Sequence, residues 1–222
     1  MFTWLQEIID WSEVWALLIP LAVLLWIKKI PASAKPIAIY VWVALALNFL
    51  QDYFWKNRLL FSFSSTPGDN IIFYNSHSII RFLLFSWFFI CIKQPFLYKV
   101  KKILPAVFII ATMINFIFFE RFTVFSSRIL GIEAGGILFY CLLYYVNQQL
   151  QEDAITYKRD ETFWLVTGIS IYMVVCFPLF LFYNSLSVKF QDFAIGIWDL
   201  HNVAYLLLCI FIARYFYAVN HQ

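Results

Sequence analysis

Several polar and ionisable residues lie inside long apolar stretches of this 222-residue chain. Such groups are costly in hydrocarbon unless they face the interior of a helix bundle or a water-filled cavity. If they converge, they would form a pocket for a small polar or amphiphilic ligand. We predict a ligand-binding set that comprises Asn48, Asp52, His77, Arg81, Glu133, Trp198, Asp199, His201 and Asn202.

Arg81 has the greatest need of a partner, because a guanidinium keeps its charge when it is buried. Glu133 and Asp199 are the acidic residues that could pair with it. Two interpretations of such a pair remain open. It could fix the bundle without any ligand, or it could belong to a cavity that binds one.

Metal chemistry would require His77 and His201 to meet Asp52, Asp199 or Glu133, since two histidines and one carboxylate can hold zinc. Seven-helix hydrolases of the ceramidase and progestin-receptor type use a comparable zinc site, but their last helix has two histidines one turn apart. Here Asp199 and His201 are two residues apart and would face different sides. We therefore predict no metal, no cofactor and no catalytic residue.

Seven apolar stretches must position these residues, and each is close to the 20 or so residues that cross a bilayer. They run over residues 14–30, 36–53, 71–92, 103–119, 129–146, 163–183 and 193–215. The composition agrees, because the chain is 63% hydrophobic with a mean hydropathy of +0.78. We predict an all-α fold: one polytopic transmembrane domain over residues 1–222, built as a seven-transmembrane helix bundle over about 14–216.

Residues 1–13 contain Glu7, Asp10 and Glu13 but no Lys or Arg. A secretory signal needs a basic start, so we expect this segment to be retained and to lie at the membrane interface as a short helix. The four cysteines all fall in apolar stretches without metal-site spacing, which indicates small packing residues.

Lys and Arg are distributed unequally between the two ends of the predicted spans. One end holds five, namely Lys56, Arg58, Arg121, Arg128 and Lys189. The other end holds ten, namely Lys28, Lys29, Lys35, Lys93, Lys99, Lys101, Lys102, Lys158, Arg159 and Arg214. Basic residues are retained in the cytoplasm, so we predict that the N-terminus is outside and the C-terminus inside. The net charge of +3 then suits an anionic inner leaflet and gives no reason to expect nucleic acid.

Three short motifs carry a resemblance. They are Phe73-Tyr-Asn-Ser-His77, Thr162-Phe-Trp-Leu-Val-Thr-Gly-Ile-Ser-Ile-Tyr172 and Ile197-Trp-Asp-Leu-His-Asn-Val-Ala-Tyr205. They resemble uncharacterised bacterial seven-helix membrane proteins and the membrane modules that precede sensor kinases. Where those proteins often have an acid in the third helix, this chain has Arg81. The resemblance implies a sensory module of the bacterial inner membrane.

We expect a receptor-like or sensory protein that binds its ligand in the outer half of the bundle. Its cytoplasmic or membrane signalling partner would be a separate protein, since the chain ends soon after the seventh stretch. The sixth stretch contains Gly168 and Pro178 and is the expected moving part. The alternatives are a small-solute transporter that uses the same polar residues and, less favoured, an intramembrane zinc hydrolase.

Overall fold

The computed structural model describes residues 3–56, 71–150 and 161–220, and the regular structure in these ranges is entirely helical. Three short helices come first and six long ones follow. The short helices are α1 (Thr3–Asp10), α2 (Ser12–Trp15) and α3 (Leu18–Leu24). The long helices are α4 (Lys35–Lys56), α5 (Ile71–Cys91), α6 (Tyr98–Phe118), α7 (Ser127–Gln149), α9 (Glu161–Lys189) and α10 (Gln191–Asn220). The all-α prediction is confirmed for these residues.

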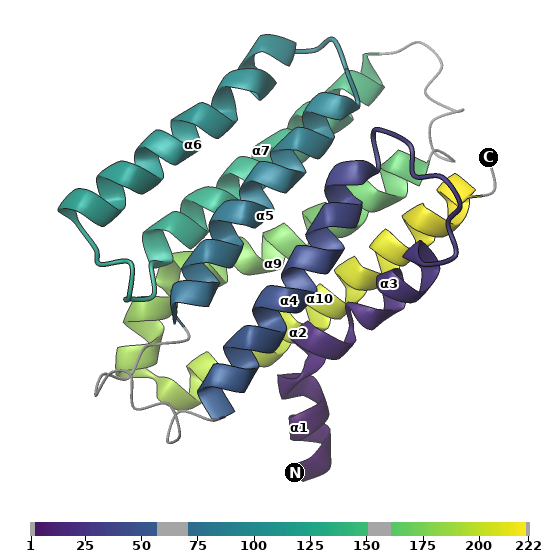
Figure 1. Ribbon diagram of the computed structural model, residues 1–222. Coiled ribbons are helices and arrows are strands. Elements are labelled where there is room, and N and C mark those ends of the chain that lie inside the picture. Colours follow the sequence, from purple (N-terminus) through teal and green to yellow (C-terminus); the bar gives the residue numbers. More distant parts are fainter. Residues whose placement is uncertain (1–2, 57–70, 151–160, 221–222) are drawn as a thin grey trace.

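Successive long helices run in opposite directions and form one bundle (Figure 1). α9 packs against both α7 and α10, while α5 lies between α4 and α7. α6 stands at one side against α5 and α7, and α3 lies on the other side against α10. Short connections, such as the one from α5 to α6, favour antiparallel neighbours of this kind.

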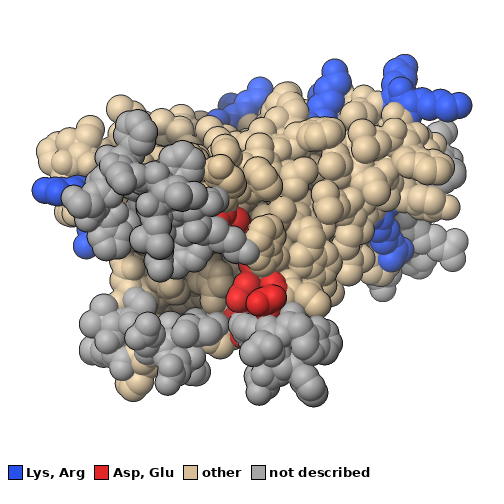
Figure 2. All heavy atoms as spheres, turned by 60° about the horizontal axis from the view of Figure 1, so that its bottom comes forward, with Lys and Arg blue, Asp and Glu red and all other residues tan. Residues whose placement is uncertain are grey.

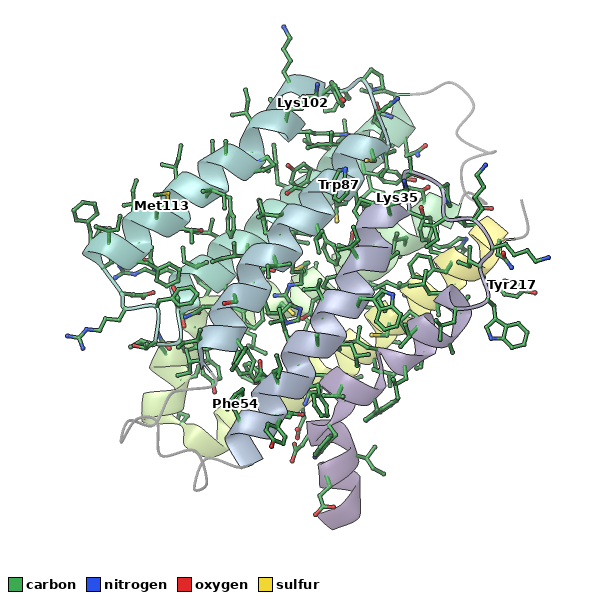
Figure 3. The ribbon with its side chains drawn as sticks, in the orientation of Figure 1. Lys35, Phe54, Trp87, Lys102, Met113 and Tyr217 are labelled. Carbon is green, nitrogen blue, oxygen red and sulfur yellow. The ribbon has the colours of Figure 1, made fainter. Side chains whose placement is uncertain are left out.

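Five of the described helices are long and apolar enough to cross a membrane, namely α4, α6, α7, α9 and α10. α5 has 21 residues, as many as α6, but Asn75, His77 and Arg81 lower its mean hydropathy. These three side chains are buried in the bundle. On α6, in contrast, Met113 is more than half exposed and points away from the other helices (Figure 3). The fold therefore has the buried polar interior and the apolar exterior of a membrane protein.

The first predicted span, residues 14–30, is not one continuous helix, and that part of the prediction is wrong. α2 ends at Trp15, α3 runs only from Leu18 to Leu24, and a turn and an irregular segment lead on to α4. Pro20 explains the first interruption, because it has no N–H to donate to the carbonyl of Ala16. Tight turns replace the regular bonds there: Leu17 N bonds to Val14 O at 3.3 Å and Ile19 N bonds to Ala16 O at 3.2 Å.

The connection between α6 and α7 is fastened to α5, which sets the depth of α7 in the bundle. The Asn75 side-chain amide donates to Phe122 O at 2.8 Å and to Val124 O at 2.9 Å. Ser126 then caps α7 by accepting from Ile129 N. With its start held in this way, α7 brings Glu133 level with Arg81.

Basic side chains collect at one end of the bundle. Lys35 and Lys102 lie at that end and Phe54 lies at the other (Figure 3). Most Lys and Arg side chains in Figure 2 stand along one edge, whereas the visible Asp and Glu side chains lie on the face turned forward, which is the side of α1. Arg58, Lys158 and Arg159, which also entered the predicted asymmetry, lie outside the described residues.

Candidate functional site

A buried ion pair joins α5 to α7. Arg81 Nε lies 2.5 Å from Glu133 Oε1, and Arg81 Nη2 donates to Glu133 Oε2 at 2.9 Å. The side chains are only 5% and 0% exposed. Two parallel N–H···O bonds of this kind are the strongest form of carboxylate recognition by arginine. Of the two acids predicted as partners of Arg81, the structure selects Glu133.

Two hydroxyl groups complete this pair. Ser78 Oγ donates to Glu133 Oε2 at 2.5 Å, and Arg81 Nη1 donates to the Tyr172 hydroxyl of α9 at 2.8 Å. The guanidinium carbon also lies 5.5 Å from the centre of the Tyr172 ring. These contacts use three of the five N–H groups of Arg81. The network thus links α5, α7 and α9 and compensates much of the cost of burying two charges.

A small cavity lies beside this network. Its polar lining is formed by Glu13, Asn48, Tyr74, His77, Ser78, Arg81, Tyr172, His201 and Tyr205. Leu130, Phe180 and Trp198 complete the wall. The centres of water molecules can occupy about 20 Å³ of the cavity, so it has room for one or two of them. A larger occupant therefore requires the wall to move.

His201 connects the cavity wall to the N-terminal part of the chain. Its Nε2 lies 3.1 Å from Glu13 Oε1, and its Nδ1 lies 3.2 Å from Cys176 Sγ. A carboxylate offers only acceptors, so Nε2 carries the proton and donates to Glu13. In the neutral imidazole Nδ1 then accepts from the Cys176 thiol. The Trp198 ring packs beside this histidine, with ring centres 5.0 Å apart.

Two asparagines, one on α4 and one on α10, fasten the same N-terminal segment. The Asn48 side-chain amide donates to Glu13 O at 2.7 Å, and the Asn202 amide donates to Ile9 O at 3.2 Å. Within the segment, Trp15 Nε1 donates to Ile8 O at 2.8 Å. Residues 8–15 are therefore held by side chains of two long helices, and Glu13 of this segment lines the cavity.

Two buried polar atoms of the lining residues have no hydrogen-bond partner among the described residues. They are His77 Nε2 and Asn48 Oδ1. His77 is 8% exposed and Asn48 1% exposed, so bulk water does not readily reach either. Unpaired buried groups of this kind are uncommon in folded proteins and call for an explanation. A bound water, or a ligand group that can donate a hydrogen bond to Asn48 Oδ1, would satisfy both.

The predicted ligand-binding residues divide into two groups. Asn48, His77, Arg81, Trp198 and His201 line the cavity. Four others lie outside its lining: Glu133 is buried behind Arg81, Asn202 binds the N-terminal segment, and Asp52 and Asp199 are half-buried.

The predicted set did not include five polar lining residues, namely Glu13, Tyr74, Ser78, Tyr172 and Tyr205. Ser78 lies one helical turn before Arg81 on α5, and that spacing could have identified it. Tyr205 lies one turn after His201 on α10 and had the same kind of signal. Tyr172 had none, because the chain contains 13 tyrosines.

Among the described residues, no group of three or more His, Cys, Asp or Glu side chains lies close enough together to hold a metal ion. His77 and His201 both face the cavity, but His201 is already engaged by Glu13 and Cys176.

No protein-family model, curated protein or solved structure matches this chain. The fold and the cavity therefore carry the functional argument.

Proposed function

We propose that this chain is a receptor-like or sensory protein of the cell membrane. In this proposal a small polar or amphiphilic ligand binds in the cavity beside Arg81, and the resulting change reaches a separate partner protein. One observation supports it above all others: polar side chains from the N-terminal segment, α4, α5, α9 and α10 meet at one buried cavity. Polar residues that served only as tolerated defects would have no reason to converge.

The proposed topology has seven crossings, with the N-terminus outside and the C-terminus in the cytoplasm of a bacterial inner membrane. The six long helices supply six of them, and α2 with α3 supplies the first in interrupted form. Two findings support this arrangement. The long helices alternate in direction (Figure 1), and basic side chains collect at the end proposed to be cytoplasmic (Figure 2).

The signal would pass through α9 and α10, since each contributes side chains to the cavity and continues to the opposite end of the bundle. Pro178 lies inside α9, only two residues before the lining residue Phe180. Earlier on the same helix, Gly168 packs directly on Phe211 of α10. A ligand that enlarges the cavity would favour one of two arrangements of this helix pair, and that preference is the signal.

Ligand-dependent thermal stability of the purified protein tests the proposal. The probes would be a panel of amino acids, polyols, monocarboxylates and short alkyl alcohols, because ligand binding to the native state raises the unfolding temperature. We expect at least one compound to stabilise the wild type and to lose that effect in His77→Leu. Ser86→Ala is the matched control, because Ser86 is a buried polar residue of the same helix outside the cavity lining.

Two results would reject the receptor proposal. If the compound crosses protein-containing liposomes at a rate that depends on His77, the chain is a transporter. If no compound in the panel stabilises the wild type, and His77→Leu and Arg81→Gln only lower the unfolding temperature, the polar network serves stability alone.

A further inference from the structure

The Glu13 carboxylate occupies a position inside the proposed binding site. It lines the cavity and accepts from His201 at 3.1 Å, and its side chain is 12% exposed. Glu13 belongs to α2, a helix of four residues, and not to one of the long helices. The chain thus places one of its own carboxylates where a ligand would bind.

Three side chains of the long helices that hold this segment are hydrogen-bond donors. His201 donates to the Glu13 carboxylate, Asn48 to Glu13 O and Asn202 to Ile9 O. If the segment moved away, these three donors would lose their acceptors at once. Buried donors without acceptors are costly, so the replacement must bring acceptors of its own.

The charges around the cavity also favour a replacement that brings acceptors, and specifically a negatively charged one. Arg81 and Glu133 neutralise each other in a two-bond contact. The remaining titratable groups of the lining are His77, His201 and the hydroxyls of Tyr74, Tyr172 and Tyr205, together with Glu13 itself. Departure of Glu13 therefore removes one negative charge and exposes only groups that are neutral or can become positive.

We infer that the ligand is a monocarboxylate that displaces the Glu13 carboxylate from His201, with residues 8–15 acting as the wall that opens. This inference rests on the proposed function, because it names the chemical class bound at the same site. Displacement also supplies the space that the small cavity lacks. Leu130, Phe180 and Trp198 then offer an apolar surface to the alkyl chain of the carboxylate.

The segment is suited to opening. α1 and α2 have eight and four residues, and helices this short are unstable without tertiary contacts. The tether within the segment, Trp15 Nε1 to Ile8 O, does not involve the cavity. Weakening it should make opening easier without altering the donors that receive the ligand.

Binding of hexanoate and oleate to wild-type, Glu13→Gln and His201→Gln proteins in nanodiscs tests the inference. Hexanoate represents a water-soluble source and oleate a bilayer source of the same head group. Glu13→Gln removes the competing charge while keeping the side-chain shape, so we expect carboxylate affinity to rise tenfold or more. His201→Gln should abolish that gain, and hexanamide should bind no form. Glu7→Gln, an exposed acid one residue before this segment, is the matched control and should behave as wild type.

Trp15→Phe provides a second test if Glu13→Gln does not fold. It should raise carboxylate affinity severalfold, since it loosens the segment and leaves Glu13 in place. Equal carboxylate affinity in wild type, Glu13→Gln and Trp15→Phe would overturn the inference, as would binding of hexanamide as tight as that of hexanoate. In either case a different compound that depends on His77 would still support the proposed receptor function, so the two failures can be told apart.

Discussion

Breaking the Arg81–Glu133 pair should destabilise the protein strongly, and removing both partners should cost far less than the two single changes together. Both side chains are at most 5% exposed and joined by two hydrogen bonds. Arg81→Met leaves the Glu133 carboxylate without its cation, and Glu133→Gln leaves the guanidinium without its anion. Stranding a buried charge costs about 3–5 kcal/mol, so the single changes together should cost about 6–10 kcal/mol.

The double variant Arg81→Met/Glu133→Gln has no buried charge to strand. What remains is the loss of hydrogen bonds by the Ser78 and Tyr172 hydroxyls, and each unsatisfied group costs about 1–3 kcal/mol. We therefore expect the double variant to lose about 2–6 kcal/mol. The coupling energy between the two positions should then be favourable and about 4 kcal/mol at the midpoints of these two ranges.

Unfolding by SDS in mixed micelles, followed by tryptophan fluorescence and circular dichroism, would measure these free energies. Arg128 and Glu120 form the matched control pair, because Arg128 Nε lies 3.7 Å from Glu120 Oε1 and the two side chains are 60% and 17% exposed, far more than those of the buried pair. Exposed pairs contribute about 0–1 kcal/mol. Additivity of Arg81→Met and Glu133→Gln within about 0.5 kcal/mol would refute the argument, since it would mean that the two charges do not stabilise each other.

Three further predictions concern helix packing, topology and anchoring. Gly168→Ala should lower the unfolding temperature, because a Cβ there would overlap the Phe211 side chain. Gly196→Ala should be neutral or slightly stabilising, since nothing lies within 4 Å of its added Cβ. Equal thermal stability of the two variants would contradict the packing. A cysteine at Lys99 should resist an impermeant thiol reagent in intact cells and one at Glu7 should react, and the reverse pattern would invert the proposed orientation. Asn75→Leu should destabilise the protein by about 1–3 kcal/mol, because it leaves two carbonyls of the α6–α7 connection without their donor, and an unchanged SDS midpoint would disprove this anchoring role.

The long helices could be predicted because a run of apolar residues leaves the backbone few alternatives in hydrocarbon. The predicted stretch 71–92 corresponds to α5 (Ile71–Cys91), and 129–146 lies within α7 (Ser127–Gln149). Boundaries shifted where helices continue into polar residues, since backbone bonding does not depend on side-chain polarity. The break between α2 and α3 was harder to predict, because a proline inside an apolar stretch can also be accommodated as a kink.

The polar residues of the long helices identified the site because their burial has a high energetic cost. Arg81 in particular required an acid, and only Glu133 and Asp199 were suitable in the sequence. Glu13 escaped notice because it follows Glu7 and Asp10, and three acids in a short segment are typical of a solvated surface. Its contact with His201 joins positions 188 residues apart, and no local pattern encodes such a contact.

The two carboxylate contacts of the interior differ in a way that separates stability from function. Arg81 and Glu133 belong to two long helices that pack along their length, so neither can leave without dismantling the bundle. Glu13 belongs to a four-residue helix and meets His201 through a single bond. A ligand that competes with a protein group can displace only the weaker of such contacts. If the proposed receptor function holds, the Arg81–Glu133 pair would persist in both states, whereas the Glu13–His201 contact would be made in one state and broken in the other.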